Sequence, residues 1–358
     1  MRILLGIIVL CTVLSVSENN PQKTKHFTSV DIEIIKQDKK LNVRAMEYIK
    51  EFKALIYLTS DGRMGILSDK AKFLPKDSLE FITEVKLKNI NDSITPNFRA
   101  LSARTKHGFG ISIGSPAAIY KLDFNKESIV YQDNHPKAFY DALEFWNDDE
   151  GIAIGDPTDG CMSIIITRDG GLTWNKLSCD QLPKAKEGEA AFAASDTNIA
   201  IIDNHTWVAT GGKTSRVLYS GNKGETWEVF DTPIVQGQST TGIYSIDFYD
   251  ENNGFAIGGD YTKPNANTNN KIRTKDGGRT WEVVANHQPP GYRSCVQYVP
   301  NSEAKALVAV GFRGINYSSD TGDNWTHLSD EGFYTLRFID DSTAYAAGQG
   351  RIVKLYFN

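Results

Sequence analysis

The sequence lacks most of the patterns by which enzyme families are recognised. No Gly-x-Gly-x-x-Gly segment follows a strand and opens a helix, so nothing supports a dinucleotide-dependent oxidoreductase. The six histidines are scattered without the spacing of metal ligands. A net charge of -5 gives no reason to expect a nucleic acid as partner. We therefore expect no metal site, no cofactor, no nucleic-acid partner and no hydrolase nucleophile turn.

Long apolar runs are also missing. The run at residues 3–16 is too short for a comfortable membrane span. It follows Met1 and Arg2 and ends in small residues up to Ser17, a pattern typical of a secretory signal peptide. We predict a signal peptide over residues 1–17 with cleavage near Ser17, and export to the periplasm or the extracellular space. Residues 18–358 are expected to form one domain, as a monomer without a membrane span.

Cysteine is scarce, and cleavage would leave Cys161, Cys179 and Cys295. Residue 170, the centre of a predicted hairpin, is midway between Cys161 and Cys179. These two cysteines are therefore expected to face each other across two strands, in a compartment that permits a disulfide. A pair of small buried residues is the alternative. Cys295 belongs to an apolar strand and is expected in the core.

What the sequence does contain is a repeated segment of the pattern Ser/Thr-x-Asp-x-Gly-x-Thr-Trp. It occurs at residues 167–174, 220–227, 274–281 and 318–325, and we call these four segments the turn motifs. Aspartate can accept backbone N–H bonds from the turn that follows it, glycine supplies a positive φ, and tryptophan buries a large apolar face. Two copies depart from the pattern, with Asn222 for Asp and Asn324 for Thr. The residues assigned this structural role are Asp169, Trp174, Asn222, Trp227, Asp276, Trp281, Asp320 and Trp325.

The spacing of the repeats predicts the fold. The turn-motif aspartates and Asn222 are 53, 54 and 44 residues apart (169 to 222, 222 to 276, 276 to 320). Repeats of ~40–50 residues are typical of propeller blades with four strands. We expect an all-β, seven-bladed β-propeller of four-stranded antiparallel blades, closed by an N-terminal strand at residues 28–35 that pairs with residues 352–357. The predicted inner strands begin at residues 43–46, 98–101, 140–143, 189–192, 243–246, 292–295 and 333–336. Residues 70–96 are expected to form a divergent outer hairpin.

The turn motifs resemble the Asp-box (BNR-like repeat) of photosystem II assembly-factor-like propellers and, more distantly, of sialidases. The first family implies a binding protein whose arginine-rich patch holds partners. Sialidases imply three arginines for a carboxylate, a tyrosine nucleophile assisted by a glutamate, and an aspartic acid. They have six blades, however, and a proline follows the Phe/Tyr-Arg-Ile of their first arginine strand. The segment Phe98-Arg99-Ala100-Leu101 lacks that proline, so no catalytic role is carried over.

Polar residues at the starts of the inner strands are predicted to gather on one face of the propeller, at the mouth of the central axis. Buried polar groups need water, a partner or a ligand. The candidate ligand-binding residues are Arg44, Arg99, Asp141, Glu189, Tyr244, Tyr292, Arg293 and Tyr334. Loops between second and third strands add Asp156, Asp260 and Tyr261, which with Glu189 are the catalytic candidates. The alternative is a water-filled channel lined with ion pairs.

Arginine is the residue that directs the functional prediction. Guanidinium groups match carboxylates and phosphates, so Arg44, Arg99 and Arg293 predict an anion site. The leading prediction is an exported binding or assembly module. Its ligand is an anionic small molecule or acidic sugar, or a protein partner that docks on this face. A sialidase-like glycoside hydrolase acting on acidic sugars is the alternative, and enzyme activity is left open.

Overall fold

The computed structural model of the chain describes residues 26–68, 82–123 and 126–358, which form β-strands and no α-helix. The all-β prediction is therefore confirmed. The predicted signal peptide, residues 1–17, lies outside the described residues, as does part of the hairpin expected at residues 70–96. Within the described ranges, no helix is long and apolar enough to span a bilayer.

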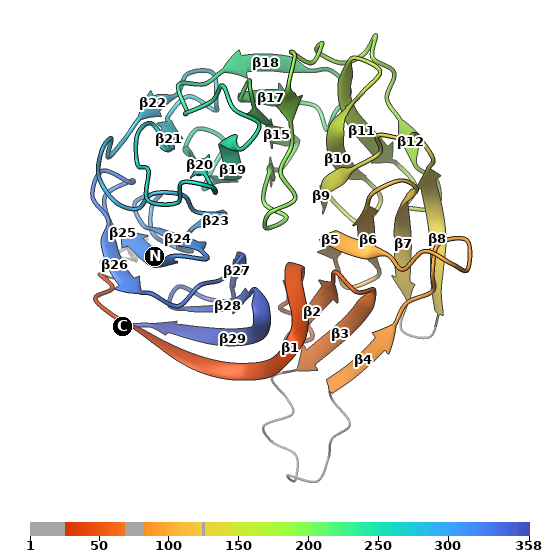
Figure 1. Cartoon of the computed structure of the whole chain (residues 1–358), viewed down its shortest axis with the longest axis horizontal. Helices are drawn as coiled ribbons and strands as arrows, with labels where there is room; N and C mark the ends of the chain where they lie inside the picture. The colour runs from red at the N-terminus through yellow and green to blue at the C-terminus, as the bar shows by residue number, and fades with distance from the viewer. Residues whose placement is uncertain (1–25, 69–81, 124–125) are drawn as a thin grey trace, which may run out of the picture.

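Antiparallel sheets stand around a central axis, in chain order (Figure 1). Four of the sheets have four strands each, and in each of them the neighbouring strands are antiparallel. The first two are β5 (Asn97–Ala103), β6 (Gly108–Ile113), β7 (Ala117–Asp123) and β8 (Lys126–Asp133), then β9 (Tyr140–Phe145), β10 (Gly151–Thr158), β11 (Cys161–Thr167) and β12 (Asn175–Lys176). The other two are β14 (Ile199–Ile202), β15 (His205–Ala209), β17 (Arg216–Ser220) and β18 (Glu228–Asp231), then β23 (Cys295–Tyr298), β24 (Leu307–Gly311), β25 (Gly314–Ser318) and β26 (Thr326–Ser329).

A seven-stranded sheet joins the two ends of the chain. Its order is β27 (Thr335–Phe338), β28 (Thr343–Ala347), β29 (Gln349–Phe357), β1 (Val30–Ile49), β2 (Ala54–Thr59), β3 (Arg63–Ser68) and β4 (Ile82–Lys86). The 20-residue strand β1 pairs with β29 from Val30↔Phe357 to Gln37↔Arg351, and with β2 from Val43↔Thr59 onward. The register shifts between Gln37 and Asn42, where the strand turns from the rim toward the axis. The expected pairing of the N-terminal segment with the final strand is thus present.

One predicted inner strand is wrong. Residues 189–192 were expected to lie innermost in their blade, but the six-stranded sheet holds only a two-residue strand there, β13 (Glu189–Ala190). The inner position of the neighbouring sheet is taken by β14. The remaining strands of the six-stranded sheet are β16 (Gly211–Gly212), β19 (Thr241–Phe248), β20 (Gly254–Asp260), β21 (Lys271–Thr274) and β22 (Glu282–Val283).

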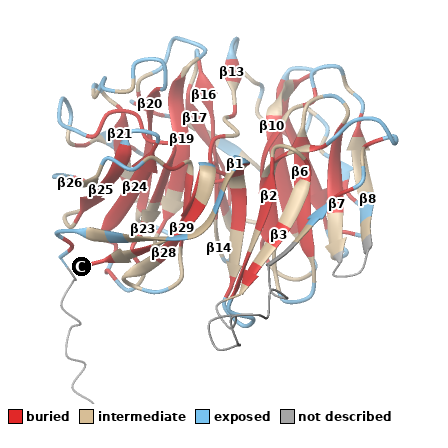
Figure 2. Cartoon of the chain, turned by 60° about the horizontal axis from the view of Figure 1, so that its bottom comes forward, coloured by how far each residue is buried: buried red, intermediate tan, exposed pale blue. Residues whose placement is uncertain are grey.

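Residues 191–198, here called the axial segment, connect β13 to β14 through the centre of the molecule. Figure 2 shows β13 at one end of the axis and β14 toward the other. Inner strands on several sides hydrogen-bond to the segment. Leu101 N and Leu143 N donate to the carboxylate of Asp196 at 2.7 and 3.3 Å, and Ile246 N donates to Thr197 O at 2.8 Å. These bonds satisfy backbone N–H groups of inner strands that face the axis.

Each turn motif connects the last two strands of its sheet: β11 to β12, β17 to β18, β21 to β22, and β25 to β26. In the first copy, Asp169 accepts from Thr173 N at 2.9 Å and from Thr173 Oγ1 at 2.6 Å, while Gly171 N donates to Thr167 Oγ1. Gly171 has φ +77°, and a Cβ there would lie 2.2 Å from the Phe109 ring of the preceding sheet. The motif glycine is therefore required both by the turn and by the contact between sheets.

The two departures from the motif keep the same hydrogen bonds with different chemistry. Asn222 accepts Thr226 N through Oδ1 at 3.0 Å and donates through Nδ2 to Thr226 Oγ1 at 2.9 Å. Asn324 replaces the threonine, and its Nδ2 donates to Asp320 Oδ2 at 2.8 Å. An amide can serve as donor and acceptor at once, so both copies close the turn.

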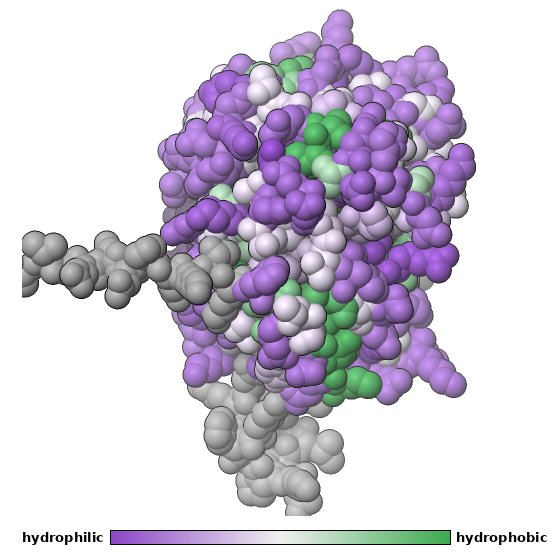
Figure 3. All heavy atoms as spheres, turned by 90° about the vertical axis from the view of Figure 1, so that its left-hand side faces the viewer, coloured by the Kyte–Doolittle hydropathy of each residue, from purple (hydrophilic) through white to green (hydrophobic). Residues whose placement is uncertain are grey.

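The core lies between neighbouring sheets. Trp207 of β15 is fully buried and stacks on Phe248 of β19 with ring centroids 3.7 Å apart. Such a pair contributes about 0.5–1.5 kcal/mol beyond the area that it buries. A disulfide joins Cys161 and Cys179, and Cys295 is a buried thiol. The outer side seen in Figure 3 is mostly hydrophilic, with separate apolar patches.

Candidate functional site

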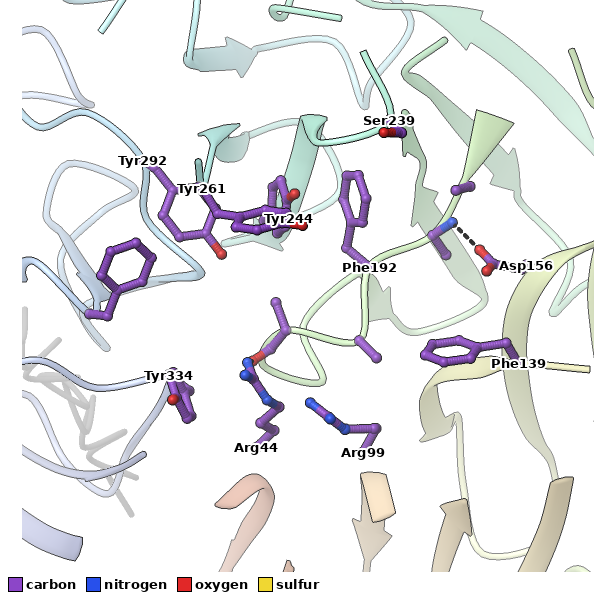
Figure 4. Close-up of a pocket in the computed structure, with 15 residues that line it drawn as sticks. Arg44, Arg99, Phe139, Asp156, Phe192, Ser239, Tyr244, Tyr261, Tyr292 and Tyr334 are labelled. Atoms are coloured by element: carbon purple, nitrogen blue, oxygen red, sulfur yellow. Dashed lines mark hydrogen bonds between the residues drawn. The ribbon is translucent and has the colours of Figure 1, made fainter. Parts of the chain in front are cut away.

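A pocket of about 600 Å³ opens at the end of the axis where the inner strands begin. We call it the axial pocket. Its lining comes from several sheets and from the axial segment, which with Ala190 supplies Ala191, Phe192, Ala193 and Ala194. The turn motifs lie at the opposite end of the strands, because antiparallel order returns every third-to-fourth connection there. Figure 4 shows arginines on one side of the pocket, tyrosines on another and Asp156 on a third.

Arg44 of β1 and Arg99 of β5 point into the pocket side by side (Figure 4). Arg44 donates to Ala194 O at 2.9 Å and stacks over the Tyr334 ring at 3.9 Å, and Arg99 donates to Asn97 Oδ1 at 3.2 Å. Within the described residues, neither guanidinium has a carboxylate within 4.0 Å, and Arg44 Nε has no hydrogen-bond partner. Burial, together with the positive charge of Arg44, lowers the pKa of Arg99 to about 10, and burial also lowers that of Arg44. Both shifts are expected of cations that lack counter-charges.

Aromatic rings form the wall that faces the arginines. Phe192 and Tyr244 stack in parallel with centroids 4.0 Å apart, and Tyr292 meets Tyr244 edge-on at 4.8 Å. Tyr261 and Phe312 extend this wall to the rim, where they are 48% and 41% exposed. Large exposed apolar rings around a polar pocket are typical of a binding surface. The wall offers flat faces to a ligand that reaches beyond the arginines.

Two carboxyl groups accompany the pocket. Asp156, from β10, is the one carboxyl among the described lining residues. Its Oδ1 accepts the N–H of Ala191 at 2.9 Å, and burial raises its pKa. Asp141 is fully buried outside the lining, and neither of its oxygens has a partner at ordinary hydrogen-bond geometry among the described residues. Burial raises the pKa of Asp141 well above its usual value. The charge of Asp156 raises it further, while the N–H of Ala193 and the charge of Arg99 oppose the rise. The protonated form of Asp141 is therefore favoured.

Seven of the residues predicted for the site do line the axial pocket. They are Arg44, Arg99, Asp156, Tyr244, Tyr261, Tyr292 and Tyr334. They gather because each lies near the start of an inner strand, near the end of a second strand or in a loop at the same end of its sheet. Asp141 lies nearby but is enclosed.

The structure places three other predicted residues outside the lining. Glu189 has a fully buried side chain whose carboxylate pairs with Arg216 at 2.6 Å and accepts the hydroxyl of Thr210 at 2.8 Å. Its predicted place at the axis depends on an inner strand at residues 189–192, which the structure does not contain. Arg293 donates to Asn316 Oδ1 at 2.5 Å and to Tyr292 O at 2.7 Å, so its guanidinium is directed away from the pocket. Asp260 accepts from Thr262 N and Oγ1 and has a lowered pKa.

Sequence reasoning missed several lining residues. Phe139 precedes β9 by one residue, Phe312 follows β24 by one, and Ser239 belongs to the loop before β19. The first two flank strand ends at the pocket face, so their place in the repeat could have indicated them. The axial segment carries no repeat signal, and only its tertiary contacts place it in the pocket.

A Gly-x-Ser-x-Gly segment does occur, at residues 110–114, against our expectation that the hydrolase nucleophile turn is missing. Ser112 lies within β6, is fully buried, and accepts Ala118 N at 3.0 Å. A nucleophile turn requires an exposed hydroxyl between a strand and a helix. The segment is therefore structural.

A second cavity, of about 400 Å³, lies at the other end of the axial segment. It is lined by Glu47, Glu144, Asp247 and the segment's own Asp196, with Arg337 among them. Arg337 pairs with Glu47 at 2.9 Å and donates to Asp196 O at 3.2 Å. Burial raises the pKa of both Glu144 and Asp247 to about 7. Among the described residues, no group of three or more His, Cys, Asp or Glu side chains is arranged to hold a metal ion.

Comparison with known proteins identifies the architecture. No family model matches the chain, and no curated protein matches it. Among solved structures the chain is similar to YCF48 bound to a D1 peptide, with a TM-score of 0.62 over 94% of this chain and 99% of that chain. YCF48 is a photosystem II assembly factor with a β-propeller fold. The sequence identity is 12%, so this likeness shows the fold: the chain is an all-β propeller of antiparallel sheets that resembles that factor.

Proposed function

We propose that this protein is an exported binding or assembly module whose axial pocket holds an anionic group between Arg44 and Arg99. The observation that carries the proposal is the pair of largely buried guanidinium groups without a carboxylate partner among the described residues. An unpaired buried cation is costly, and an anion bound between two such groups would relieve that cost. Charge-assisted bonds from two guanidinium forks also fit carboxylates and phosphates in geometry.

The similarity of fold supports a protein partner as one source of that anion. YCF48 was solved with a D1 peptide, so a propeller of this shape is able to bind a polypeptide. In this chain, the exposed rings of Tyr261 and Phe312 at the rim would add apolar contact around the arginines. A small acidic molecule is the other source, because about 600 Å³ is within the range of small-ligand pockets.

No observation favours the sialidase-like hydrolase. That chemistry needs three arginines together and a tyrosine beside a glutamate. Here Arg293 is directed away from the pocket, and Glu189 is held by Arg216. Among the described lining residues, Asp156 has no second carboxyl partner for glycoside hydrolysis.

Binding calorimetry of point variants tests the anion site. We expect Arg99→Ala to weaken binding of 4-methylbenzoate, inorganic phosphate or an acidic peptide, whichever the wild type binds. The loss should be about 1.5–3 kcal/mol, or roughly tenfold to a hundredfold. Arg99→Lys should restore part of it, because an ammonium cannot make the two-pronged contact. Arg104→Ala is the matched control, since Arg104 lines the cavity at the other end of the axis. Equal losses in Arg99→Ala and Arg104→Ala would refute the assignment.

We further infer that the strands form seven blades with Asp-box turns, and that β1 closes the ring by serving the first and last blades. The pairing of β1 with both β2 and β29 supports this, as does the regular recurrence of the turn motifs. Deleting residues 26–36 would expose the edge of β29 and remove the Phe27–Phe357 stacking. A steep fall in melting temperature is expected, because a propeller depends on contacts between neighbouring blades. A truncated protein as stable as the full chain would contradict closure.

A further inference from the structure

The axial pocket contains unpaired charges of both signs. Arg44 and Arg99 have no carboxylate within 4.0 Å among the described residues. Asp156 likewise has no cation within that distance, and the polar contact of its carboxylate is the backbone N–H of Ala191. All three residues are only partly exposed, so each charge loses part of its hydration without the counter-charge that normally offsets that cost. Other buried charges differ in their partners: Glu189 pairs with Arg216 and Glu47 with Arg337, whereas the buried cations Lys271 and Arg293 donate to amide and carbonyl oxygens instead.

The two kinds of charge lie on different sides of the pocket. Figure 4 shows Arg44 and Arg99 together, with Asp156 separated from them and attached to the axial segment. Between these poles the lining is apolar: Phe139, Phe192, and the alanines of the axial segment. A ligand that reached both poles would thus lay a hydrocarbon body across aromatic faces. Aromatic faces are also favourable for a cationic group, as Arg44 over Tyr334 already shows.

We propose that the axial pocket selects a dipolar ligand: a ring-bearing molecule with a carboxylate at one end and an amine at the other. This rests on the proposed anion site, to which it adds Asp156 as the residue that determines specificity. The carboxylate binds between Arg44 and Arg99, the ring lies against Phe192 and Phe139, and the ammonium binds Asp156. All three unpaired charges then gain partners in one binding event.

Pairing of charges at both poles, rather than overall neutrality, favours such a ligand over a simple anion. The charged lining residues are two arginines and one aspartate, so the pocket carries a net +1 (2 − 1). A phosphate dianion would leave an excess negative charge close to Asp156, which is repulsive in a low-dielectric site. A monocarboxylate would leave Asp156 without a partner. A zwitterion satisfies both poles without placing like charges together.

The test compares three probes that share one ring. They are 4-(aminomethyl)benzoate with both charges, 4-methylbenzoate with the carboxylate alone, and benzylamine with the amine alone. Calorimetry on the full chain should show the first binding about tenfold more tightly than 4-methylbenzoate, the gain of one added charge-assisted hydrogen bond. In Asp156→Asn the two carboxylates should bind equally, since the amide keeps an acceptor for Ala191 N but loses the charge. Arg99→Ala should weaken both.

Each outcome separates this inference from the function on which it rests. Binding of 4-methylbenzoate that depends on Arg99, without any gain from the amine, would overturn the dipolar ligand and leave the anion site standing. If neither 4-(aminomethyl)benzoate nor 4-methylbenzoate binds in a way that depends on Arg99, both the dipolar ligand and the anion site are overturned for carboxylates. The comparison of probes on the wild type needs no variant, so it decides the matter even if Asp156→Asn fails to fold. If a folded Asp156→Asn protein still prefers 4-(aminomethyl)benzoate to 4-methylbenzoate, the amine does not bind at Asp156.

Discussion

The two ends of this propeller use aspartate in opposite ways. At the turn-motif end, Asp169 accepts three hydrogen bonds, from Thr167 Oγ1, Thr173 N and Thr173 Oγ1, and its pKa lies below the usual value, chiefly because of the Thr173 hydroxyl. At the pocket end, Asp141 has no partner at ordinary geometry among the described residues, and burial raises its pKa. The first arrangement stabilises the carboxylate, and the second destabilises it.

This difference indicates that the turn-motif end serves the stability of the fold, whereas the pocket end is suited to binding a ligand. The turn motifs repeat because every copy closes the same kind of tight turn, and the hydrogen bonds that close it lie within the motif itself. The pocket end does not repeat: equivalent positions hold Arg44, Arg99, Asp141 and Tyr244. Uncompensated charges at non-repeating positions cost stability, and such sites are where ligands are usually bound. Substitutions at three aspartates test this contrast.

The largest expected effect is on the axial segment, which separates the two ends. Asp196→Ala would remove the acceptor for Leu101 N and Leu143 N, both buried. Each buried unsatisfied N–H costs about 1–3 kcal/mol, so the free energy of unfolding should fall by about 2–5 kcal/mol. Chemical denaturation would measure this.

Asp196→Asn is the control for that change. Asp196 has φ +60°, which asparagine tolerates better than alanine, and the amide retains one acceptor. It should therefore lose less stability than the alanine variant. If the two variants were equally stable, the buried carboxylate would not be holding the inner strands together.

A smaller loss is expected at the turn-motif end. Asp276→Ala removes the acceptor of Thr280 N and Oγ1. Thr280 is exposed, and water can replace part of what is lost, so the cost should be about 0.5–1.5 kcal/mol. Probe binding in the axial pocket should stay at the wild-type level in calorimetry. Weakened binding with unchanged stability would mean that the turn motifs serve a ligand after all.

The smallest expected effect has the opposite sign. Because the pKa of Asp141 is raised in the folded state, the folded protein holds more protons than the unfolded chain above pH ~4. Its contribution to stability therefore declines as pH rises from that value toward neutrality. Asp141→Asn removes the titrating group, so its melting temperature should exceed that of the wild type at pH 7 and converge with it near pH 3. A melting temperature below the wild type at both pH values would show that Asp141 is a structural acceptor.

Local signals predicted most of the architecture. The turn motifs, the strands that precede them and the pairing predicted for residues 28–35 with the final strand could be inferred, because the pattern that marks each of these segments is local. Arg44, Arg99 and the pocket tyrosines were predicted from their place in the repeat. Glu189 was misplaced because Glu-Ala-Ala-Phe fits the spacing of an inner strand, although the chain there leaves the sheet and enters the axis. Arg293 occupies an inner-strand start, but the neighbouring Asn316 draws its guanidinium away from the pocket.

The sequence alone determined that this chain forms a β-propeller, because turn chemistry, alternating hydrophobicity and repeat length are encoded over a few residues at a time. Only the tertiary structure decided which charges meet a partner. Glu189 finds Arg216 at a separation of 27 residues, and the axial segment finds inner strands up to 141 residues away. Whether a buried charge has a partner depends on groups that different sheets bring to the axis. A local sequence pattern does not indicate which of these distant groups will lie close together.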